Sequence, residues 1–410
     1  MNNKQIMSFS LGLLMISFTT LTIFANPLST EDPLSDTEMR LDTSHLGNNS
    51  IGSLQGHVDT HDTLSIGIQF TCVVTDNSSV ICWGRTDYGE TGSGLTGIEA
   101  YHNASYVVGL SGITVVEVAA YWDHACALSD IGEVYCWGRN SLGQLGTGNN
   151  VDSTTPVQVS LPSGVVVASL GQGPTSTTCV ISTDGDGYCW GYNNAGQIGN
   201  GEVCSIVEQT SKSTCAGGGT LDYVLTPQQV NMPSSVDITS INMGGEHTCA
   251  TGTDGGVYCW GQDNNCRVTG GDPITDANGD ASCGFQHRQP SPRKIMFQNT
   301  AVTIPDAQNL SFTQVVVGWV FSCGLTDTGA VICWGANTES QQGIGSNNNQ
   351  PADVVPTLAI APSGEHALSI TASTAQACAL FNESGAFCWG DNWGGNAGDY
   401  DGTNDWYCNY

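Results

Sequence analysis

The sequence has little positive charge. Nine Lys and Arg residues stand against 38 Asp and Glu residues, which gives a formal net charge of -29. Nucleic acid is bound by clustered Lys and Arg, and the densest basic run here is only Arg288 to Lys294. We therefore expect no nucleic acid among the partners. A chain this acidic stays soluble, repels anionic surfaces and attracts cations or basic partners.

Catalytic signatures are missing as well. The sequence contains no Gly-x-Ser-x-Gly elbow, no Walker loop and no His-Glu-x-x-His zinc motif. Charged residues of both signs make up only 11% of the chain, so Gly, Ser, Thr and Asn must supply much of the polar surface. The sequence accordingly predicts a protein that is not an enzyme and has no cofactor.

Long apolar runs are absent apart from one at the N-terminus. Lys4 precedes an uncharged and mostly apolar stretch from Ile6 to Phe24, and Ala25 offers a small residue for cleavage. This pattern predicts a signal peptide over residues 1–25, with an uncleaved N-terminal membrane anchor as the alternative. An acidic linker over residues 26–45 follows. The expected location is secreted, periplasmic or cell surface.

Cysteine, in contrast, is abundant and regularly spaced. Twelve of the 17 cysteines form pairs that are ten residues apart, and Trp-Gly follows the second member of every pair. The pairs are Cys72 and Cys82, Cys126 and Cys136, Cys179 and Cys189, Cys249 and Cys259, Cys323 and Cys333, and Cys378 and Cys388. Successive Trp-Gly tryptophans lie 54, 53, 70, 74 and 55 residues apart. A period near 54 with two enlarged copies indicates a repeat architecture.

Each copy has the pattern of a β-hairpin. Pairing Cys126 with Cys136 leaves a three-residue loop that ends at Gly132, and such loops favour a left-handed residue at their last position. The equivalent residues in the other copies are Ser78, Gly185, Gly255, Gly329 and Ser384. Opposed residues of a hairpin come close enough for a disulfide, so we expect six hairpin disulfides in an exported protein. Free thiols or metal ligands are the alternative.

Both faces of the predicted strands are apolar. Cys126, Leu128 and Val134 share one face, and Ala127 and Tyr135 share the other. A sheet with one wet face would alternate polar and apolar residues. Blades stacked around an axis are covered on both sides, so the pattern favours an all-β propeller.

The motifs also resemble a known family. "HACAL…VYCWGRNSLGQLGTG", together with "CVISTDGDGYCWGYNNAGQIGNG" and "HTCATGTDGGVYCWGQ", is similar to the regulator of chromosome condensation repeat over roughly residues 66 to 410. The resemblance implies a β-propeller, usually of seven blades. The sequence departs from the pattern in two ways. Cys266 and Ser340 replace the turn glycine found at Gly143, and His is absent before Cys72, Cys179, Cys323 and Cys378.

The number of blades is open. Six recognisable blades are visible, and Leu46 to Gly56, "LGNNSIGSLQG", resembles the tail of a partial seventh. We assign residues 46–410 to the propeller and expect the chain to end before its seventh blade is complete, with Cys408 unpaired. The alternative is a six-bladed or open ring with a free or intermolecular Cys408.

Two insertions enlarge neighbouring copies downstream of Trp-Gly. One lies near residues 204–215 and the other near residues 266–283, and each carries an expected disulfide, Cys204 with Cys215 and Cys266 with Cys283. Asp276, Asn278 and Asp280 are spaced like the start of a calcium loop, but Ala281 replaces the expected glycine. A polar turn is the favoured interpretation there, and calcium is a weak candidate.

His124 and His247 precede hairpin cysteines at equivalent positions. We expect them to be buried structural residues bonded to the backbone, rather than zinc ligands or catalytic groups. Trp122 and Trp319 precede hairpin strands, and the sequence does not show whether they are exposed.

Taken together, the patterns predict an exported, monomeric, non-enzymatic module that binds an unknown protein or glycan through loop faces. The resemblance adds two alternatives: inhibition of a secreted enzyme, as in propeller-type β-lactamase inhibitors, and guanine-nucleotide exchange, as in the founding family member. A glycan-directed hydrolase or lyase is the remaining alternative, and it would need convergent carboxylates or a metal.

Overall fold

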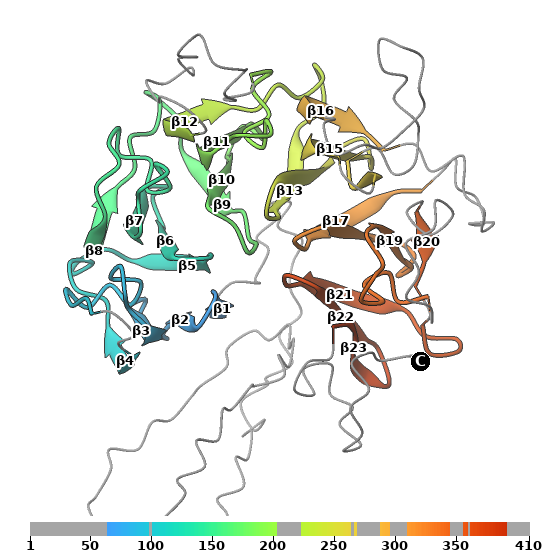
Figure 1. Ribbon diagram of the computed structural model, residues 1–410, viewed down its shortest axis with the longest axis horizontal. Helices are drawn as coiled ribbons and strands as arrows, with labels where there is room; N and C mark the ends of the chain where they lie inside the picture. Colours follow the sequence, from blue (N-terminus) through green and yellow to red (C-terminus); the bar gives the residue numbers. More distant parts are fainter. Residues whose placement is uncertain are drawn as a thin grey trace, which may run out of the picture.

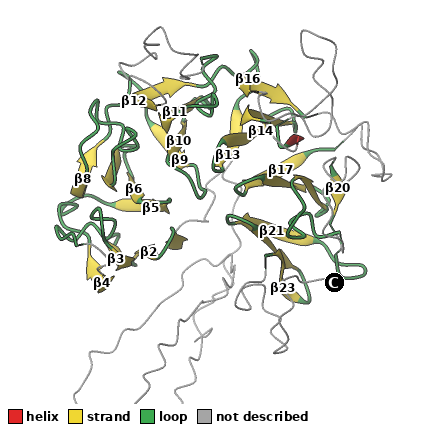
Figure 2. Cartoon of the chain, in the orientation of Figure 1, coloured by secondary structure: helices red, strands yellow, loops and turns green. Residues whose placement is uncertain are grey.

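The described part of the chain is a β-propeller whose six antiparallel sheets are arranged around a common axis (Figure 1). The computed structural model describes residues 64–97, 101–202, 223–263, 266–268, 288–295, 310–344, 356–359 and 361–391. Figure 2 shows that strands and the loops between them make up nearly all of this part. Within it, no helix is long and apolar enough to cross a membrane. The all-β propeller expected from the sequence is confirmed.

Each sheet is one sequence repeat, and its strands pair in chain order from the axis outward. Sheet 1 contains β1 (Leu64–Ile66), β2 (Phe70–Val74), β3 (Val80–Arg85) and β4 (Tyr101–Tyr106). Sheet 2 contains β5 (Val115–Ala120), β6 (His124–Ser129), β7 (Val134–Gly138) and β8 (Ser153–Gln158). Sheet 3 contains β9 (Val167–Leu170), β10 (Thr177–Ser182), β11 (Gly187–Tyr192) and β12 (Tyr223–Gln229).

The second half of the ring repeats this order. Sheet 4 contains β13 (Ile238–Met243), β14 (His247–Gly252), β15 (Val257–Gln262) and β16 (Arg288–Lys294). Sheet 5 contains β17 (Phe312–Val317), β18 (Phe321–Thr326), β19 (Val331–Gly335) and β20 (Thr357–Leu358). Sheet 6 contains β21 (Ala367–Ala372), β22 (Gln376–Phe381) and β23 (Gly385–Gly390). Leu46 to Gly56, the expected partial seventh blade, lies outside the described residues.

The paired cysteines lie directly opposite one another on the second and third strands. In sheet 2, Cys126 faces Cys136 with their Cα atoms 4.0 Å apart, and a disulfide joins them. The same disulfide occurs in every sheet, between Cys72 and Cys82, Cys179 and Cys189, Cys249 and Cys259, Cys323 and Cys333, and Cys378 and Cys388. Short opposed contacts of this kind are typical of a non-hydrogen-bonded antiparallel pair.

The Trp-Gly motif marks a bulge. The pairing between β7 and β8 shifts its register between Cys136 and Gly138, which face Val157 and Ser153, so the extra residues lie on β8, while Trp137 pairs with Ala125 on β6. The same shift recurs in sheets 1, 3 and 4. Gly138 has φ 102°, and a Cβ there would lie 2.6 Å from the Asp123 carbonyl oxygen. Only glycine fits a bulge with this backbone and this approach.

The last residue of the hairpin loop is left-handed, as the sequence predicts, in five sheets but not in the sixth. The last loop residue is left-handed at Gly132, and Ser78 takes the same conformation with φ 60°. In sheet 6 the expectation for Ser384 is wrong, because the left-handed residue is Gly385, with φ 90°. Gly385 already pairs with Phe381.

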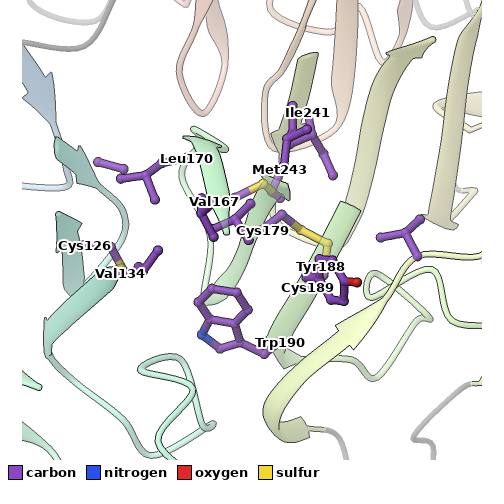
Figure 3. Packing of buried hydrophobic residues seen from close by; sticks show 14 of the residues in the cluster. Cys126, Val134, Val167, Leu170, Cys179, Tyr188, Cys189, Trp190, Ile241 and Met243 are labelled. Carbon is purple, nitrogen blue, oxygen red and sulfur yellow. A yellow bond between two sulfur atoms is a disulfide. The ribbon is translucent and has the colours of Figure 1, made fainter. Parts of the chain in front are cut away.

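Consecutive sheets pack face to face through apolar side chains. Figure 3 shows this core between sheets 2, 3 and 4, where Val134 and Leu170 lie near Trp190 and Met243. All six residues of β6 are buried, as are all six of β14. Burial of both strand faces, which the apolar pattern predicts, is confirmed for these strands.

A repeated hydrogen bond connects each of sheets 2 to 6 to the sheet before it. The turn that follows Trp-Gly in one sheet offers a backbone carbonyl to the tryptophan Nε1–H of the next sheet. These bonds, which we term latches, are Trp137 to Glu90, Trp190 to Gln144, Trp260 to Gln197, Trp334 to Arg267 and Trp389 to Gln341, with distances of 2.7–3.0 Å. Because both partners are buried, each latch satisfies groups that would otherwise be unpaired.

Candidate binding surface

One end of the propeller carries two sets of loops. In an antiparallel four-stranded sheet, the loop between the first and second strands and the loop between the third and fourth strands leave from the same edge. Backbone bonds confirm this in sheet 2, where Arg139 N–H donates to the Asp123 carbonyl at 2.8 Å. We call this end the insertion face, because both long insertions connect third to fourth strands, in sheets 3 and 4.

Two tryptophans meet at the axis on the insertion face. Trp122 follows β5 of sheet 2, and Trp319 follows β17 of sheet 5. Their ring centroids are 4.6 Å apart at an interplanar angle of 59°, and both side chains are half-buried. An aromatic contact of this geometry contributes about 1 kcal/mol beyond the area that it buries. The two rings therefore form a fixed aromatic surface that solvent still reaches.

Neighbouring loops hold both tryptophans in place. Trp122 N–H donates to the Thr175 carbonyl at 3.3 Å, and Trp319 N–H donates to the Thr374 carbonyl at 2.8 Å. A Cβ at Gly245 would lie 2.7 Å from the Trp319 ring, so this position in sheet 4 requires glycine. Contacts between loops of several sheets thus hold the aromatic pair in place.

An ion-pair network lies beside Trp122. The Asp123 carboxylate is buried and accepts from Arg139 at 3.0 Å and from Arg85 at 3.4 Å. The Arg139 guanidinium carbon lies 4.7 Å from the Tyr88 ring centroid, and Arg85 also bonds Asp87 at 2.7 Å. Buried charges must be paired, and networks contribute more than isolated surface pairs. The network joins the turns of sheets 1 and 2.

A buried cation supports Trp319. The Arg267 side chain is 1% exposed and donates to the Trp319 carbonyl at 3.1 Å and to Glu246 at 3.0 Å. Its Nε–H donates to the Gln262 carbonyl at 2.7 Å. Desolvation lowers the pKa of Arg267, and the Glu246 charge opposes that shift. Arg267 therefore acts as a brace between the turn of sheet 4 and the axial loop of sheet 5.

The latch turn of sheet 1 contains a buried acid. Gln144, Gln197 and Gln341 occupy equivalent turn positions, and each side-chain oxygen accepts from the backbone N–H two residues earlier. Glu90 stands there in sheet 1 and accepts from Tyr88 N–H at 2.8 Å. Burial raises the pKa of Glu90 to about 7, assisted by the Asp123 charge and opposed by hydrogen bonds and by Arg85.

The two candidate histidines are buried, and each bonds a hydroxyl of the next sheet. His124 Nε2 lies 2.8 Å from Thr178 Oγ1, and His247 Nε2 lies 2.9 Å from Ser322 Oγ. The expectation of backbone partners thus missed these side-chain contacts. Burial lowers the pKa of His124 to about 3, and burial followed by the Arg267 charge lowers that of His247. Both imidazoles are neutral at pH 7 and lie away from solvent.

Several candidate residues lie outside the described part of the chain. These are the calcium candidates Asp276, Asn278 and Asp280, together with Cys204, Cys215, Cys283 and Cys408. Cys266 is described and is disulfide-bonded. Within the described ranges, no group of three or more His, Cys, Asp or Glu residues converges as a metal site.

The opposite end of the propeller carries acidic residues. We call it the hairpin face, because the loops between second and third strands lie there. Every loop between second and third strands carries an acid, and these acids are Asp76, Asp130, Asp184, Asp254, Asp327 and Glu383. Lys294 neutralises one of them, through a 2.7 Å bond to Asp254. Three of the nine basic residues, Arg85, Arg139 and Arg267, instead support the insertion face. The two ends therefore offer partners distinct surfaces.

No local sequence pattern predicts the central contact of the insertion face. Trp122 and Trp319 come from sheets three repeats apart, and nothing local in either loop specifies the other. Their shared position before a hairpin strand was visible, since both are two residues upstream of the second strand. The two tryptophans meet because both loops point toward the axis, which the sequence does not show.

Comparison with known proteins agrees with this geometry. The sequence matches models of the regulator of chromosome condensation (RCC1) repeat at residues 115–144, 238–267 and 312–341, and at residues 132–180 and 184–251. The ultraviolet-B receptor UVR8 of Arabidopsis thaliana is 25% identical over 370 residues, covering 82% of this chain and 78% of that protein. The human E3 ubiquitin-protein ligase HERC2 is 24% identical over 279 residues, which is 67% of this chain but 5% of that protein.

Solved structures show the same fold. Prp20p of Saccharomyces cerevisiae, described with its binding to Gsp1p and histones, superposes with a TM-score of 0.60 at 19% identity, covering 82% of this chain and 74% of that one. Human WBSCR16 superposes with a TM-score of 0.58 at 21% identity, covering 76% and 69%. The solved structures show the propeller fold, and the model matches show that the chain carries repeats of the regulator of chromosome condensation (RCC1) type.

Proposed function

We propose that this protein is an exported, non-enzymatic module that binds a protein or glycan partner through the insertion face. The observation that carries the proposal is the half-buried pair of Trp122 and Trp319 at the axis. Tryptophan is enriched among the residues that dominate binding energy, especially near the centre of an interface. Loops on a rigid scaffold are the usual place for recognition.

The insertions support the choice of this face. Both leave it from neighbouring sheets, so they start beside the axial loops rather than at the far end of the molecule. Arg139 is also partly exposed, with 37% of its side chain accessible. Aromatic and Arg side chains are the types most enriched in interfaces. A partner on this face would contact aromatic and basic residues together.

Export is supported by the cysteine chemistry. Six buried disulfides are typical of proteins that mature in an oxidising compartment. The N-terminal pattern over residues 1–25 agrees with a signal peptide. The relative described with Gsp1p and histones binds proteins, which favours a protein over a glycan as the first partner to seek.

The test compares two double variants of the full chain. Trp122→Ala with Trp319→Ala removes the axial rings, and Ile131→Ala with Val166→Ala removes two exposed apolar side chains of the hairpin face. Each protein is immobilised and probed with defined glycans and with secreted proteins from its source. We expect the tryptophan variant to lose at least about tenfold in affinity, as truncation of central anchors does, while the hairpin-face variant binds like the wild type.

Several outcomes would overturn this assignment. Equal losses in both double variants would place binding elsewhere, provided that intact mass shows the disulfides retained in each. Turnover of a glycan by the wild type would indicate a hydrolase or lyase. Release of nucleotide from a small GTPase would indicate an exchange factor, and inhibition of a secreted enzyme that survives loss of both rings would indicate a different inhibitory surface.

A further inference from the structure

A β-bulge recurs at the same place in the first strands of sheets 2 to 6. In sheet 2, Val115 and Glu117 face two consecutive residues of β6, Ser129 and Leu128, so Val116 is the extra residue. The same pairing occurs in the four sheets that follow. A bulge turns its side chain away from the ladder. The extra residues, which we call the axial bulge residues, are Val116, Ala168, Thr239, Thr313 and Leu368.

The axial bulge residues lie at the hairpin-face end of the axis. The first strands are the innermost strands of the propeller (Figure 1), and each bulge is at the start of its strand, opposite the residues that lead into the hairpin loop. Four of the five residues are exposed, including Val116 at 49% and Leu368 at 60%, and Thr239 is half-buried. The residue before each bulge is buried in the core, so the position of the bulge is fixed; these residues are Val115, Val167, Ile238, Phe312 and Ala367.

The axial bulge residues present an apolar surface. The three aliphatic members have no polar side-chain atoms. Thr239 Oγ1 lies 2.8 Å from Thr251 Oγ1, and Thr313 Oγ1–H donates to the Leu325 carbonyl at 3.3 Å, so both threonine hydroxyls bond within their own sheets. Exposed apolar side chains that gather in one place and are rimmed by polar residues are typical of an interaction surface.

The rim around this surface is acidic. Asp130, Asp184 and Asp327 of the hairpin loops are exposed, and none of them forms an ion pair within the part of the chain that the structure describes. Asp237 and Glu365 add negative charge just before the first strands of sheets 4 and 6. Complementary charge speeds association, whereas like charges brought together across an interface oppose it. The surface therefore favours a cationic partner.

We infer that the hairpin-face end of the axis binds a cationic segment of a protein partner. An apolar residue of the segment contacts the axial bulge residues, and Lys or Arg residues on either side of it pair with the acidic hairpin loops. This surface lies at the opposite end of the propeller from Trp122 and Trp319, so it binds independently of the partner proposed for the insertion face.

The strand spacing predicts the pattern of the segment. Each hairpin loop is centred between the second and third strands, which places it about 7 Å from the first strand at the usual spacing of about 4.8 Å. In an extended segment, the next side chain on the same side lies two residues away, also at a distance of about 7 Å. The expected pattern is thus a basic residue, any residue, an apolar residue, any residue and a second basic residue.

The affinities of two synthetic peptides for the full chain test the inference. The first peptide, acetyl-Gly-Lys-Ser-Leu-Ser-Lys-Gly, has the expected pattern, and the second has serine in place of leucine. Both carry a fluorescent label, and binding is measured by anisotropy. We expect the leucine peptide to bind at least about tenfold more tightly, because a leucine side chain is buried in the complex. Val116→Ser combined with Leu368→Ser should abolish this difference and leave the affinity for the serine peptide unchanged.

Two triple variants separate a defined site from general attraction to an acidic protein. One combines Asp130→Asn, Asp184→Asn and Asp327→Asn on the hairpin face. Its matched control removes three charges from connections on the insertion face, with Asp152→Asn, Glu202→Gln and Glu339→Gln. We expect the hairpin-face variant to weaken binding of both peptides by at least about fivefold, and the control to weaken it by less than about twofold because salt screens distant charges.

Circular dichroism and intact mass verify that each variant keeps its strands and disulfides. Equal affinities of the two peptides for the wild type would overturn the inference, and so would equal losses in the two triple variants. Loss of peptide binding in Trp122→Ala with Trp319→Ala would place the peptide on the insertion face instead. Unchanged binding in that variant is the expected result, and it leaves the test of the insertion face unaffected.

Discussion

Replacing Glu90 with glutamine should stabilise the protein at neutral and alkaline pH. Glu90 is 1% exposed, and its Oε1 has no hydrogen-bond partner, whereas its Oε2 accepts from Tyr88 N–H. Glutamine at the equivalent position of sheets 2, 3 and 5 keeps that backbone bond without a charge. Glu90→Gln therefore preserves the turn and removes only the ionisation.

The size of the effect follows from the pKa of Glu90. Burial raises it from an ordinary 4.5 to about 7, so the folded state holds its proton at pH values where the unfolded chain has lost it. Below pH 4.5 both states are protonated and no penalty exists. Between pH 4.5 and 7 the penalty grows, and above pH 7 it is constant at up to about 3 kcal/mol.

Denaturant unfolding of wild type and Glu90→Gln at pH 4, 6 and 8 measures this difference. We expect equal free energies of unfolding at pH 4 and a variant that is about 2–3 kcal/mol more stable at pH 8. Gln144→Glu is the reciprocal control, and it should be destabilised at pH 8 but much less at pH 4. A stability difference for Glu90→Gln that is the same at all three pH values would refute the reasoning.

Three further variants test the interior. His124→Gln should remove a loss of stability on acidification, because burial lowers the pKa of His124 to about 3. The unfolded chain binds a proton at this residue below pH 6.5, whereas the folded protein does not. Between pH 7 and 4 the wild type should therefore lose up to about 3 kcal/mol more stability than the variant. Replacing both Cys126 and Cys136 with alanine should cost about 2–3 kcal/mol for a ten-residue loop, and an unchanged unfolding midpoint would contradict this. Arg267→Met should cost about 2–4 kcal/mol through lost buried bonds and an unpaired Glu246, and an unaltered melting temperature would count against the brace.

Features governed by short-range rules were predictable from the sequence. The ten-residue spacing fixes the register that opposes Cys126 and Cys136, because a three-residue loop leaves one way to pair the strands. Apolar residues on both strand faces require neighbours on both sides. The left-handed backbone at Cys266 and Ser340, with φ 54° and 60°, shows that the turn persists where its glycine is replaced.

Features that depend on neighbouring sheets were not predictable. The hydroxyl partner of His124 comes from the next repeat, and a histidine before a hairpin cysteine does not indicate which group faces it. The contact of Trp122 with Trp319 depends on how far each axial loop extends toward the centre. Ser78 takes the left-handed conformation at the end of its hairpin loop, whereas in sheet 6 Gly385 takes it instead of Ser384, and the shared loop length does not distinguish the two cases.

The latches also impose an order on folding. The carbonyl of each turn belongs to one sheet, and the tryptophan that satisfies it belongs to the sheet that follows in the chain. As the chain is synthesised from its N-terminus, the Gln144 carbonyl gains its latch donor, and the sheet its apolar cover, only after Trp190 and the following strands have been made. Each sheet is thus completed only by its successor, so the newest part of an emerging chain is always its least stable part.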